Sequence, residues 1–371
     1  MKCKIEDIVE VTMGQSPKSQ YYNTEGNGVP FLQGNRTFGF KRPTFDTYTT
    51  LVTKSAKARD IIMSVRAPVG DLNITPVDMC LGRGVCSLRM KNGNQEFLYY
   101  MMKYYMPQLL NKESGTVFGS VNRNDINGLE VDIPEDTDKQ RKIARYLTMI
   151  DDKIELNNEI NNNLSDLLQA IYQKQFGEVS LGANQGILSD ICSYSKEKVA
   201  VSELNVNTYF STENMLPEKA GSTKATSLPT TPQTTACRRG DTLISNIRPY
   251  FKKIVYCEDM CGCSTDVLCF TPVQSQYAAY LFSTLYTDKF FAFMVAGSKG
   301  TKMPRGDKQQ IMTYPVVLPA ESELEEFNAI AFPVLGQLNS NKAENKRLSA
   351  LRDALLPKLM SGEIDITAID F

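Results

Sequence analysis

The feature that most constrains this chain of 371 residues is an internal repeat. Ile5-Glu6-Asp7-Ile8 returns in altered form as Leu188-Ser189-Asp190-Ile191, and Val131-Asp132-Ile133-Pro134 returns as Val316-Val317-Leu318-Pro319. These and four further pairs of short segments follow one another in the same order, at offsets of 180 to 185 residues. Self-similarity at one long period indicates repeated structural units. We therefore expect two halves of similar fold.

Each half shows the same order of expected elements. A strand-rich region punctuated by Gly, Pro and Asn leads to a helix, a polar glycine loop, an apolar strand and a long helix. The expected fold class is α+β, with two similar globular domains, each a mixed or antiparallel sheet plus helices, separated by two long antiparallel coiled-coil helices in a pseudo-two-fold repeat. The expected boundaries are residues 1–136 and 179–320 for the globular domains, 137–178 for the first long helix, and 321–371 for the second with its C-terminal tail.

The two long helices carry apolar residues in alternating steps of three and four, the spacing of a coiled-coil seam. Two Asn residues interrupt each seam one turn apart. If the helices pair, these Asn residues are expected to meet each other, because a buried Asn fixes the register of a helix pair. The alternative is that they face solvent where the helices splay. The expected helix-pair interface comprises Ile143, Leu147, Ile150, Ile154, Asn157, Asn161, Leu164 and Leu168, with Leu338, Asn341, Asn345, Leu348 and Leu355.

The absence of His excludes more classes of site than any other count. Zincin motifs, Ser-His-Asp triads and Cys-His proteases all require His. The sequence also lacks a P-loop, a dinucleotide-binding glycine motif, a nucleophile elbow and the sequence motifs of adenine methyltransferases. We therefore expect no catalytic residues and no cofactor.

Nine Cys residues, an odd number without the spacing of a disulfide framework, favour a reduced cytoplasmic protein. The acidic opening of the sequence does not suit a signal peptide, and no apolar run reaches the roughly 18 residues of a membrane span. Cys257, Cys261 and Cys263, with Cys269 nearby, could be zinc ligands. The first half has no counterpart of them, so we expect core cysteines and no metal.

A net charge of −1 gives no general attraction to nucleic acid, so binding would need local patches. Arg and Lys recognise guanine edges and Asn and Gln recognise adenine, while both kinds contact phosphates. Arg66 and Arg248 recur at matching positions of the repeat, although an Arg packed beside a strand is the alternative for them. For the others, the alternative is a solvated surface charge. The candidates are Lys18, Gln33, Asn35, Arg36, Lys41, Arg42, Arg66, Arg83, Asn122 and Arg123 in the first half, and Lys224, Arg248, Lys252, Lys253, Lys302 and Arg305 in the second.

Five segments of the first half form a recognisable series that ends at the start of the first long helix. They are Gly14-Gln15-Ser16-Pro17-Lys18 with Tyr22, Val29-Pro30-Phe31-Leu32-Gln33-Gly34, Ser114-Gly115-Thr116-Val117-Phe118, Leu129-Glu130-Val131-Asp132-Ile133-Pro134 and Asp138-Lys139-Gln140-Arg141-Lys142-Ile143. A weaker copy of the last segment begins at Glu321. By these segments the chain resembles, along nearly its whole length, the specificity subunits of type I restriction–modification systems.

This resemblance implies a non-catalytic subunit whose two target-recognition domains each recognise one part of a split, asymmetric sequence in double-stranded DNA. It also implies two methyltransferase subunits bound by the helices, and nuclease/translocase subunits in the full complex. The rival hypothesis is a scaffold or adaptor that assembles protein partners through its helix pair and does not bind DNA.

Overall fold

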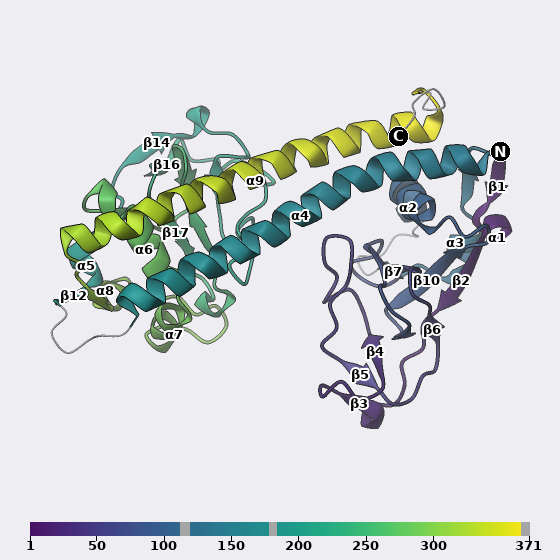
Figure 1. Ribbon diagram of the computed structural model, residues 1–371, viewed down its shortest axis with the longest axis horizontal. Coiled ribbons are helices and arrows are strands. Elements are labelled where there is room, and N and C mark those ends of the chain that lie inside the picture. The colour runs from purple at the N-terminus through teal and green to yellow at the C-terminus, as the bar shows by residue number, and fades with distance from the viewer. Residues whose placement is uncertain (112–118, 178–183, 365–371) are drawn as a thin grey trace. The chain divides into compact units, whose positions relative to one another are not determined.

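The computed structural model describes residues 1–111, 119–177 and 184–364, and Figure 1 shows their secondary structure. The motif expected at Ser114–Phe118 lies outside the described residues. The chain forms two compact units. Unit 1 comprises Met1–Asn158 with Ala343–Phe371, and unit 2 comprises Glu159–Lys342. Both units combine sheets with helices, as expected for an α+β protein.

Unit 1 is built around a four-stranded antiparallel sheet with the strand order β2-β10-β7-β8. A short pair, β1 with β11, and a smaller sheet complete its β structure. The smaller sheet has five strands of only two to four residues each, in the order β3-β5-β4-β9-β6. In the smaller sheet, β4 and β9 are parallel. The strands are β1 (Lys2–Lys4), β2 (Val9–Met13), β3 (Tyr22–Asn23), β4 (Val29–Leu32), β5 (Tyr48–Thr49), β6 (Ser55–Ala56), β7 (Ile61–Ser64), β8 (Leu72–Ile74), β9 (Met79–Leu81), β10 (Val85–Met90) and β11 (Glu130–Asp132).

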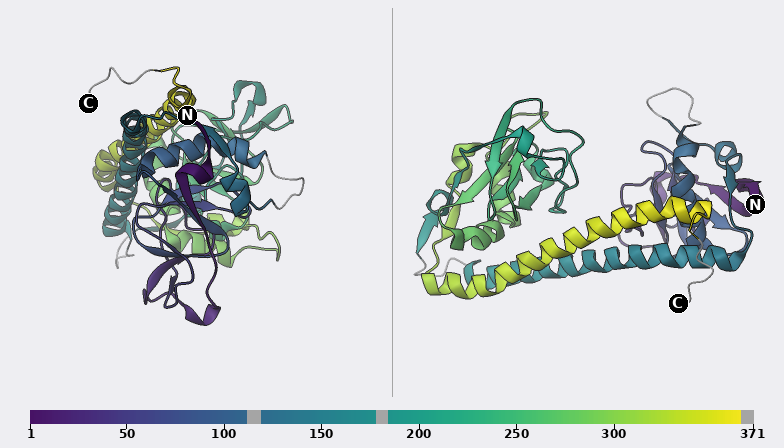
Figure 2. Two further views of the ribbon diagram at one scale, coloured as in Figure 1. Left: turned by 90° about the vertical axis from the view of Figure 1, so that its right-hand side faces the viewer. Right: turned by 90° about the horizontal axis from the view of Figure 1, so that it is seen from above.

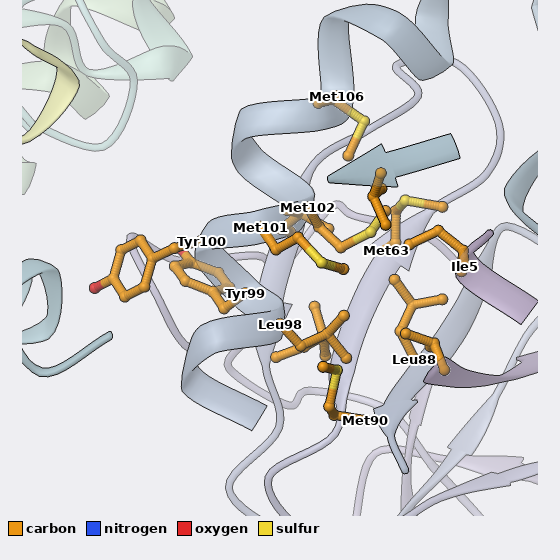
Figure 3. Packing of buried hydrophobic residues seen from close by; sticks show 14 of the residues in the cluster. Ile5, Met63, Leu88, Met90, Leu98, Tyr99, Tyr100, Met101, Met102 and Met106 are labelled. Carbon is orange, nitrogen blue, oxygen red and sulfur yellow. The ribbon is translucent and has the colours of Figure 1, made fainter. Parts of the chain in front are cut away.

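Helix α2 (Gln95–Leu110) covers one face of the four-stranded sheet in unit 1, and Figure 3 shows the packing. Leu98 and Met101 lie toward the strand residues Met63 and Leu88, and all four are fully buried. Tyr100 points away from that sheet, yet it too is buried. A helix that is apolar on nearly every side must be covered on nearly every side. The short helices α1 (Ile5–Ile8) and α3 (Arg123–Asn127) complete the unit.

Unit 2 repeats the topology of the main sheet and of the short pair, while its smaller sheet has four strands, in the order β14-β16-β19-β15, instead of five. Its main sheet has the order β13-β20-β17-β18, its short pair is β12 with β21, and its smaller sheet again contains a parallel pair, β15 with β19. The strands are β12 (Gln185–Ile187), β13 (Cys192–Tyr194), β14 (Lys198–Ala200), β15 (Tyr209–Phe210), β16 (Gln233–Cys237), β17 (Thr242–Ser245), β18 (Ile254–Tyr256), β19 (Cys261–Cys263), β20 (Val267–Pro272) and β21 (Pro315–Val317).

The helices of unit 2 follow the same order with one change. Two helices, α6 (Ala278–Leu285) and α7 (Asp288–Ala296), stand where unit 1 has the single helix α2. The short helices α5 (Leu188–Ile191) and α8 (Lys308–Met312) correspond to α1 and α3. The sequence repeat is therefore a repeat of topology.

Two long helices each contribute to both units: α4 (Thr137–Phe176), of 40 residues, and α9 (Glu321–Ser361), of 41 residues. Within each unit they lie side by side (Figure 2). Of the expected interface residues, eight are buried (Ile143, Leu147, Ile154, Asn157, Asn161, Leu168, Leu338 and Asn341) and five are half-buried (Ile150, Leu164, Asn345, Leu348 and Leu355).

The Asn residues of the two seams contact one another. In unit 1 the amide Nδ2 of Asn157 donates to Oδ1 of Asn345 at 2.9 Å, and in unit 2 Nδ2 of Asn341 donates to Oδ1 of Asn161 at 2.9 Å. The residue numbers rise along α4 as they fall along α9, so the helices are antiparallel. Asn157 is only 1% exposed, and the alternative in which it faces solvent does not hold. Each contact maps onto the other when 184 is added to the α4 residue and subtracted from the α9 residue.

Among the helices of the described ranges, none combines the length and apolar character that a membrane-spanning helix needs.

Candidate nucleic-acid interface

Several loops of unit 1 meet at the end of β7. The backbone N–H of Val65 donates to the carbonyl of Gly84 at 2.9 Å, and the N–H of Gly84 donates to the carbonyl of Gln33 at 2.9 Å. Across β7, the N–H of Val121 donates to the carbonyl of Val65 at 3.1 Å. Through these bonds, the loops that carry Gln33, Arg66 and Arg83 adjoin one another.

Two glycines allow this close approach. A Cβ atom on Gly82 would lie 2.6 Å from the Cα of Gln33, and one on Gly84 would lie 2.4 Å from the carbonyl oxygen of Gln33. Both distances are too short for a side chain, so glycine is required at these positions. Arg83 stands between them, exposed, and its backbone N–H donates to Oγ of Ser16 at 3.0 Å. The segment leading to Lys18 is thereby joined to the same set of loops.

The candidate side chains at this end of unit 1 fall into two groups, those without a partner in the described part of the chain and those with an acidic partner. Arg66 and Arg83 are exposed, and their side chains have no hydrogen-bond or acidic partner among the described residues. Lys18 and Arg123 share both properties. By contrast, Arg36 forms an ion pair with Asp46 at 2.7 Å, and the Asn35 amide donates to Asp71. The first group is free to meet a ligand, whereas the second would first have to exchange partners.

Three expected candidates of unit 1 have structural roles instead. The Lys41 side chain is 4% exposed, and its ammonium lies 3.1 Å from Asp152 of α4. Arg42 pairs with Glu155 of the same helix at 2.7 Å. Asn122 caps α3, since its side-chain oxygen accepts the backbone N–H groups of the helix start. Lys41 is thus buried and paired, while Arg42 and Asn122 are exposed and would have to leave these partners to meet a ligand.

The corresponding end of unit 2 has the same backbone plan. At the end of β17 the N–H of Asn246 donates to the carbonyl of Asp266 at 2.8 Å, and the N–H of Arg248 donates to the carbonyl of Pro304 at 2.8 Å. Arg305 forms an ion pair with Asp266 at 2.9 Å, which ties the second glycine loop to the turn before β20. Arg248 is therefore joined through its backbone to Pro304, as Arg66 bridges to Ser120 in unit 1.

The remaining cations of unit 2 also divide. Arg248, Lys224 and Lys302 are exposed, and their side chains have no acidic or hydrogen-bonding partner among the described residues. Lys252 instead pairs with Asp288 at 3.1 Å. Lys253 donates to the carbonyl of Thr212 at 2.5 Å, and burial lowers its pKa. Lys252 and Lys253 therefore support the loop in which they lie, a role the sequence did not indicate.

Sequence reasoning missed two aromatic residues at this end of unit 2. Tyr250 is 47% exposed and Phe251 is 37% exposed, in the short helical turn η3 (Pro249–Phe251) that follows Arg248. The matching positions after Arg66 carry no aromatic residue, so the sequence shows that the ring pair is particular to the second half, but it does not show that the rings are exposed.

The cysteines of unit 2 are neither scattered nor exposed. Five of them lie in one buried cluster, in which the sulfur atoms of Cys257 and Cys261 are 3.6 Å apart. All nine cysteines of the chain fall in the described residues and are free thiols. Within those residues, no group of three or more His, Cys, Asp or Glu side chains is arranged to hold a metal ion. The five cysteines of the cluster are Cys237, Cys257, Cys261, Cys263 and Cys269.

Known proteins are similar to this chain in sequence and in fold. The family model described as type I restriction modification DNA specificity domain matches residues 1–166. A putative type I restriction enzyme MjaX specificity subunit of Methanocaldococcus jannaschii is 39% identical over 153 residues, which are 41% of this chain and 36% of that protein. That alignment thus spans about a third of the relative's length.

Two further comparisons cover nearly the whole chain. The type I restriction enzyme MjaIX specificity subunit of M. jannaschii is 21% identical over 402 aligned positions, covering 98% of this chain and 93% of that protein. The crystal structure of the S subunit of a type I restriction–modification system from M. genitalium covers 99% of this chain and 96% of its own, with a TM-score of 0.61 and 17% identity. At that identity the likeness to the solved structure is one of fold.

Proposed function

We propose that this chain, whose residues 1–166 match the family model of the type I restriction modification DNA specificity domain, is a sequence-specific DNA-binding subunit of a type I restriction–modification system that recognises a bipartite, asymmetric site. The observation that carries the proposal is the duplicated arginine. Arg66 and Arg248 stand at the same position of the repeat, and each is exposed shortly after an inner strand of the main sheet, β7 or β17. An exposed Arg among polar loops has the chemistry that contacts guanine edges or phosphates.

The two half-sites are proposed to differ in sequence. Both units present the same sheet end, but their side chains there differ. Gln33 and Arg83 belong to unit 1, and Lys224 and Lys302 to unit 2. Related surfaces with different side chains recognise different bases. We assign recognition to residues 1–136 and 179–320, and we assign the connection between them, with partner binding, to residues 137–178 and 321–371.

We propose that two methyltransferase subunits bind the long helices and that nuclease/translocase subunits join them in the full complex. In unit 1, α4 exposes Met149 (55%) and Leu156 (50%) seven positions apart, and in unit 2 it exposes Ile160 (37%) and Leu167 (49%) at the same spacing. Seven residues are nearly two helical turns, so each pair lies on one helix face. Exposed apolar faces of this kind favour protein partners.

We further propose that the chain contributes no chemistry of its own to the complex and acts in the cytoplasm. The sequence supplies no His and no cofactor motif, which supports the first point. The nine free cysteines support the second, because a reducing compartment keeps thiols free.

The test is to identify the modified sequence and then to measure binding. Methylation sequencing of a host carrying the system is expected to give one split motif, and duplexes containing it should bind the subunit–methyltransferase complex in preference to scrambled duplexes. Affinity should fall as salt rises, because phosphate contacts release counterions. If the assembled complex does not bind duplex DNA, the rival adaptor hypothesis is favoured instead, whereas equal binding of all sequences would contradict sequence-specific recognition.

A further inference from the structure

Left-handed backbone is concentrated in one place in unit 2. Five non-glycine residues of the described chain have positive φ, and four of them lie in or against the loop between β17 and β18. Arg248 (φ 50°) and Lys252 (φ 51°) flank η3, and Glu218 (φ 51°) and Lys219 (φ 61°) belong to a turn that packs against it. Strained backbone persists only where its surroundings hold it in place, and it gathers at binding sites.

The surroundings of this loop do hold it in place. The N–H groups of Glu218 and Lys219 donate to the carbonyls of Phe251 and Lys252 at 2.8 and 3.0 Å. The ammonium groups of Lys219 and Lys252 lie 2.8 and 3.1 Å from one carboxylate oxygen of Asp288 at the start of α7. These two bonds lower the pKa of Asp288. Backbone and charge therefore fix one conformation of the loop.

The fixed loop displays the two exposed aromatic rings. The ring centroids of Tyr250 and Phe251 are 4.7 Å apart, and the rings are tilted by 56°. The ammonium of Lys253 lies 5.9 Å from the centroid of Phe251, and Arg248 precedes the pair. Aromatic rings normally leave water on folding, so rigid exposure of two together indicates a ligand. Rings set among cations suit nucleic-acid bases and their phosphates.

Unit 1 lacks this device. Its equivalent loop between β7 and β8 runs Arg66-Ala67-Pro68-Val69-Gly70-Asp71, without an aromatic residue. In this loop no residue other than glycine has positive φ, and the left-handed position is Gly70. The Arg at the head of the loop is common to both units, and the ring pair is particular to unit 2.

We propose that Tyr250 and Phe251 form a wedge that inserts at one base step of the second half-site and partly unstacks it. This inference rests on the proposed function, since it presupposes that unit 2 binds duplex DNA. Because pyrimidine–purine steps unstack most readily, the wedge would add a preference for such a step at a position where no base edge is read by hydrogen bonding.

The experiment places 2-aminopurine in turn at each position of the second half-site. The unmodified subunit, assembled with its methyltransferase, is expected to raise the fluorescence of the probe severalfold at one step only. Tyr250→Ala with Phe251→Ala should abolish that rise and weaken binding by roughly 10- to 100-fold, the effect of losing base stacking on aromatic side chains. Val69→Ala, in the matching loop of unit 1, is the control and should change neither value.

The single variants Tyr250→Leu and Asp288→Asn complete the test. Tyr250→Leu keeps the side chain apolar and should retain part of the fluorescence rise. Asp288→Asn removes the charge that holds the loop and should reduce the rise in a complex that still assembles. Sequence-specific binding without a fluorescence rise at any position would overturn the wedge and leave the proposed function standing. Failure of the unmodified complex to bind DNA would overturn both. If the double variant assembles poorly with methyltransferase while DNA binding by the complex that forms is unchanged, the rings are a protein contact.

Discussion

At one position of the helix pair, the two units bury different kinds of side chains. In unit 1, Arg352 of α9 donates to buried Asp151 of α4 at 2.7 Å. The repeat places Leu168 and Leu335 at the equivalent positions of unit 2, and these leucines are 1% and 3% exposed in its apolar core. The same position of the helix pair therefore accepts either a buried ion pair or a pair of leucines.

This difference indicates the structural role of the buried charges in unit 1. A buried ion pair adds little net stability, because the desolvation of both ions offsets their attraction. It does restrict geometry: Asp151 also accepts the hydroxyl of Tyr100 from α2 at 2.8 Å, so three helices meet at one carboxylate. Lys41 and Arg42 pair with α4 in the same unit. Unit 1 thus fixes its helices by directed contacts.

Unit 2 surrounds its part of the helix pair mainly with aromatic rings. Tyr172 and Phe176 of α4 pack against Tyr280 of α6 and Phe327 of α9, with ring centroids 5.0 to 6.3 Å apart. Aromatic packing of this kind buries a large apolar area, and the Tyr172 hydroxyl also donates to Oγ1 of Thr284 at 2.9 Å. The two units therefore depend on different forces at equivalent positions.

The largest expected effect comes from breaking the ion pair on one side only. Arg352→Leu leaves the Asp151 carboxylate, which is 0% exposed, without its cation, and this should lower the free energy of unfolding by about 3–5 kcal/mol. Chemical denaturation, with hydrogen exchange to locate the loss to unit 1, measures it.

Copying the leucine pair of unit 2 is the matched rescue. Arg352→Leu with Asp151→Leu and Tyr100→Phe removes both ions and the hydroxyl that would lose its acceptor. Stability should return to within about 1–2 kcal/mol of the unmodified protein, since an apolar replacement of a buried ion pair is often neutral. If the triple variant is as unstable as Arg352→Leu alone, the two units are not interchangeable at this position.

The duplicated arginines test the comparison at the candidate interface. Arg66→Ala should weaken binding to the first half-site alone, and Arg248→Ala to the second alone, each by about 1–3 kcal/mol with relaxed preference at one base pair. Competition between duplexes mutated in one half-site separates the two effects. A loss that is equal for every sequence assigns the residue to a phosphate, and unchanged binding with lower stability makes it structural.

The Asn contacts test whether equivalent positions carry equal weight. Asn161→Leu leaves the amide of Asn341 without this acceptor and should cost about 1–2 kcal/mol, while Asn161→Leu with Asn341→Leu should cost less than the single change. Thermal melts compare them with the matching variants of unit 1, Asn345→Leu alone and Asn345→Leu with Asn157→Leu. A double variant much less stable than its single parent would show that the site cannot accommodate two leucines.

Much of the fold could be predicted because its signals are local. The seam spacing predicted two long helices, and the repeat predicted two halves of similar fold, whose main sheets share one topology. The role of Lys41 could not be predicted, because its partner Asp152 is 111 residues away and only the tertiary fold unites them. The capping role of Asn122 did have a local signal, Asp125 three positions later, which fits a capping-box pattern.

The exposure of Tyr250 and Phe251 lay beyond sequence reasoning for a different reason. It depends on left-handed backbone at Arg248 and Lys252, and side chains other than glycine and asparagine give no sign of that conformation. Similarly, the sequence indicated that the seam Asn residues would meet, but the pairing of Asn157 with Asn345 became clear only from the structure.

The smallest expected effect concerns Lys103, which lies near the charged side chains of Asp151 and Arg352 in unit 1. Burial lowers the pKa of Lys103 to about 8, although nearby Asp151 acts in the opposite direction, and the Lys103 ammonium lies 4.5 Å from the ring centroid of Tyr99. Below pH 8 the folded protein bears the cost of a poorly solvated ammonium. Between pH 8 and the ordinary lysine pKa of 10.5, the folded state has released a proton that the unfolded state still holds, so this cost disappears as pH rises. Lys103→Met should therefore be more stable than the unmodified protein at pH 7, by on the order of 1 kcal/mol after solvent screening, with the difference shrinking toward pH 10. The equivalent position of unit 2 is Ser283, which does not titrate, so Ser283→Ala is the control whose effect should not change with pH. A Lys103→Met difference that is constant from pH 7 to pH 10 would show that the ammonium is solvated and that the charged network of unit 1 ends at Asp151 and Arg352.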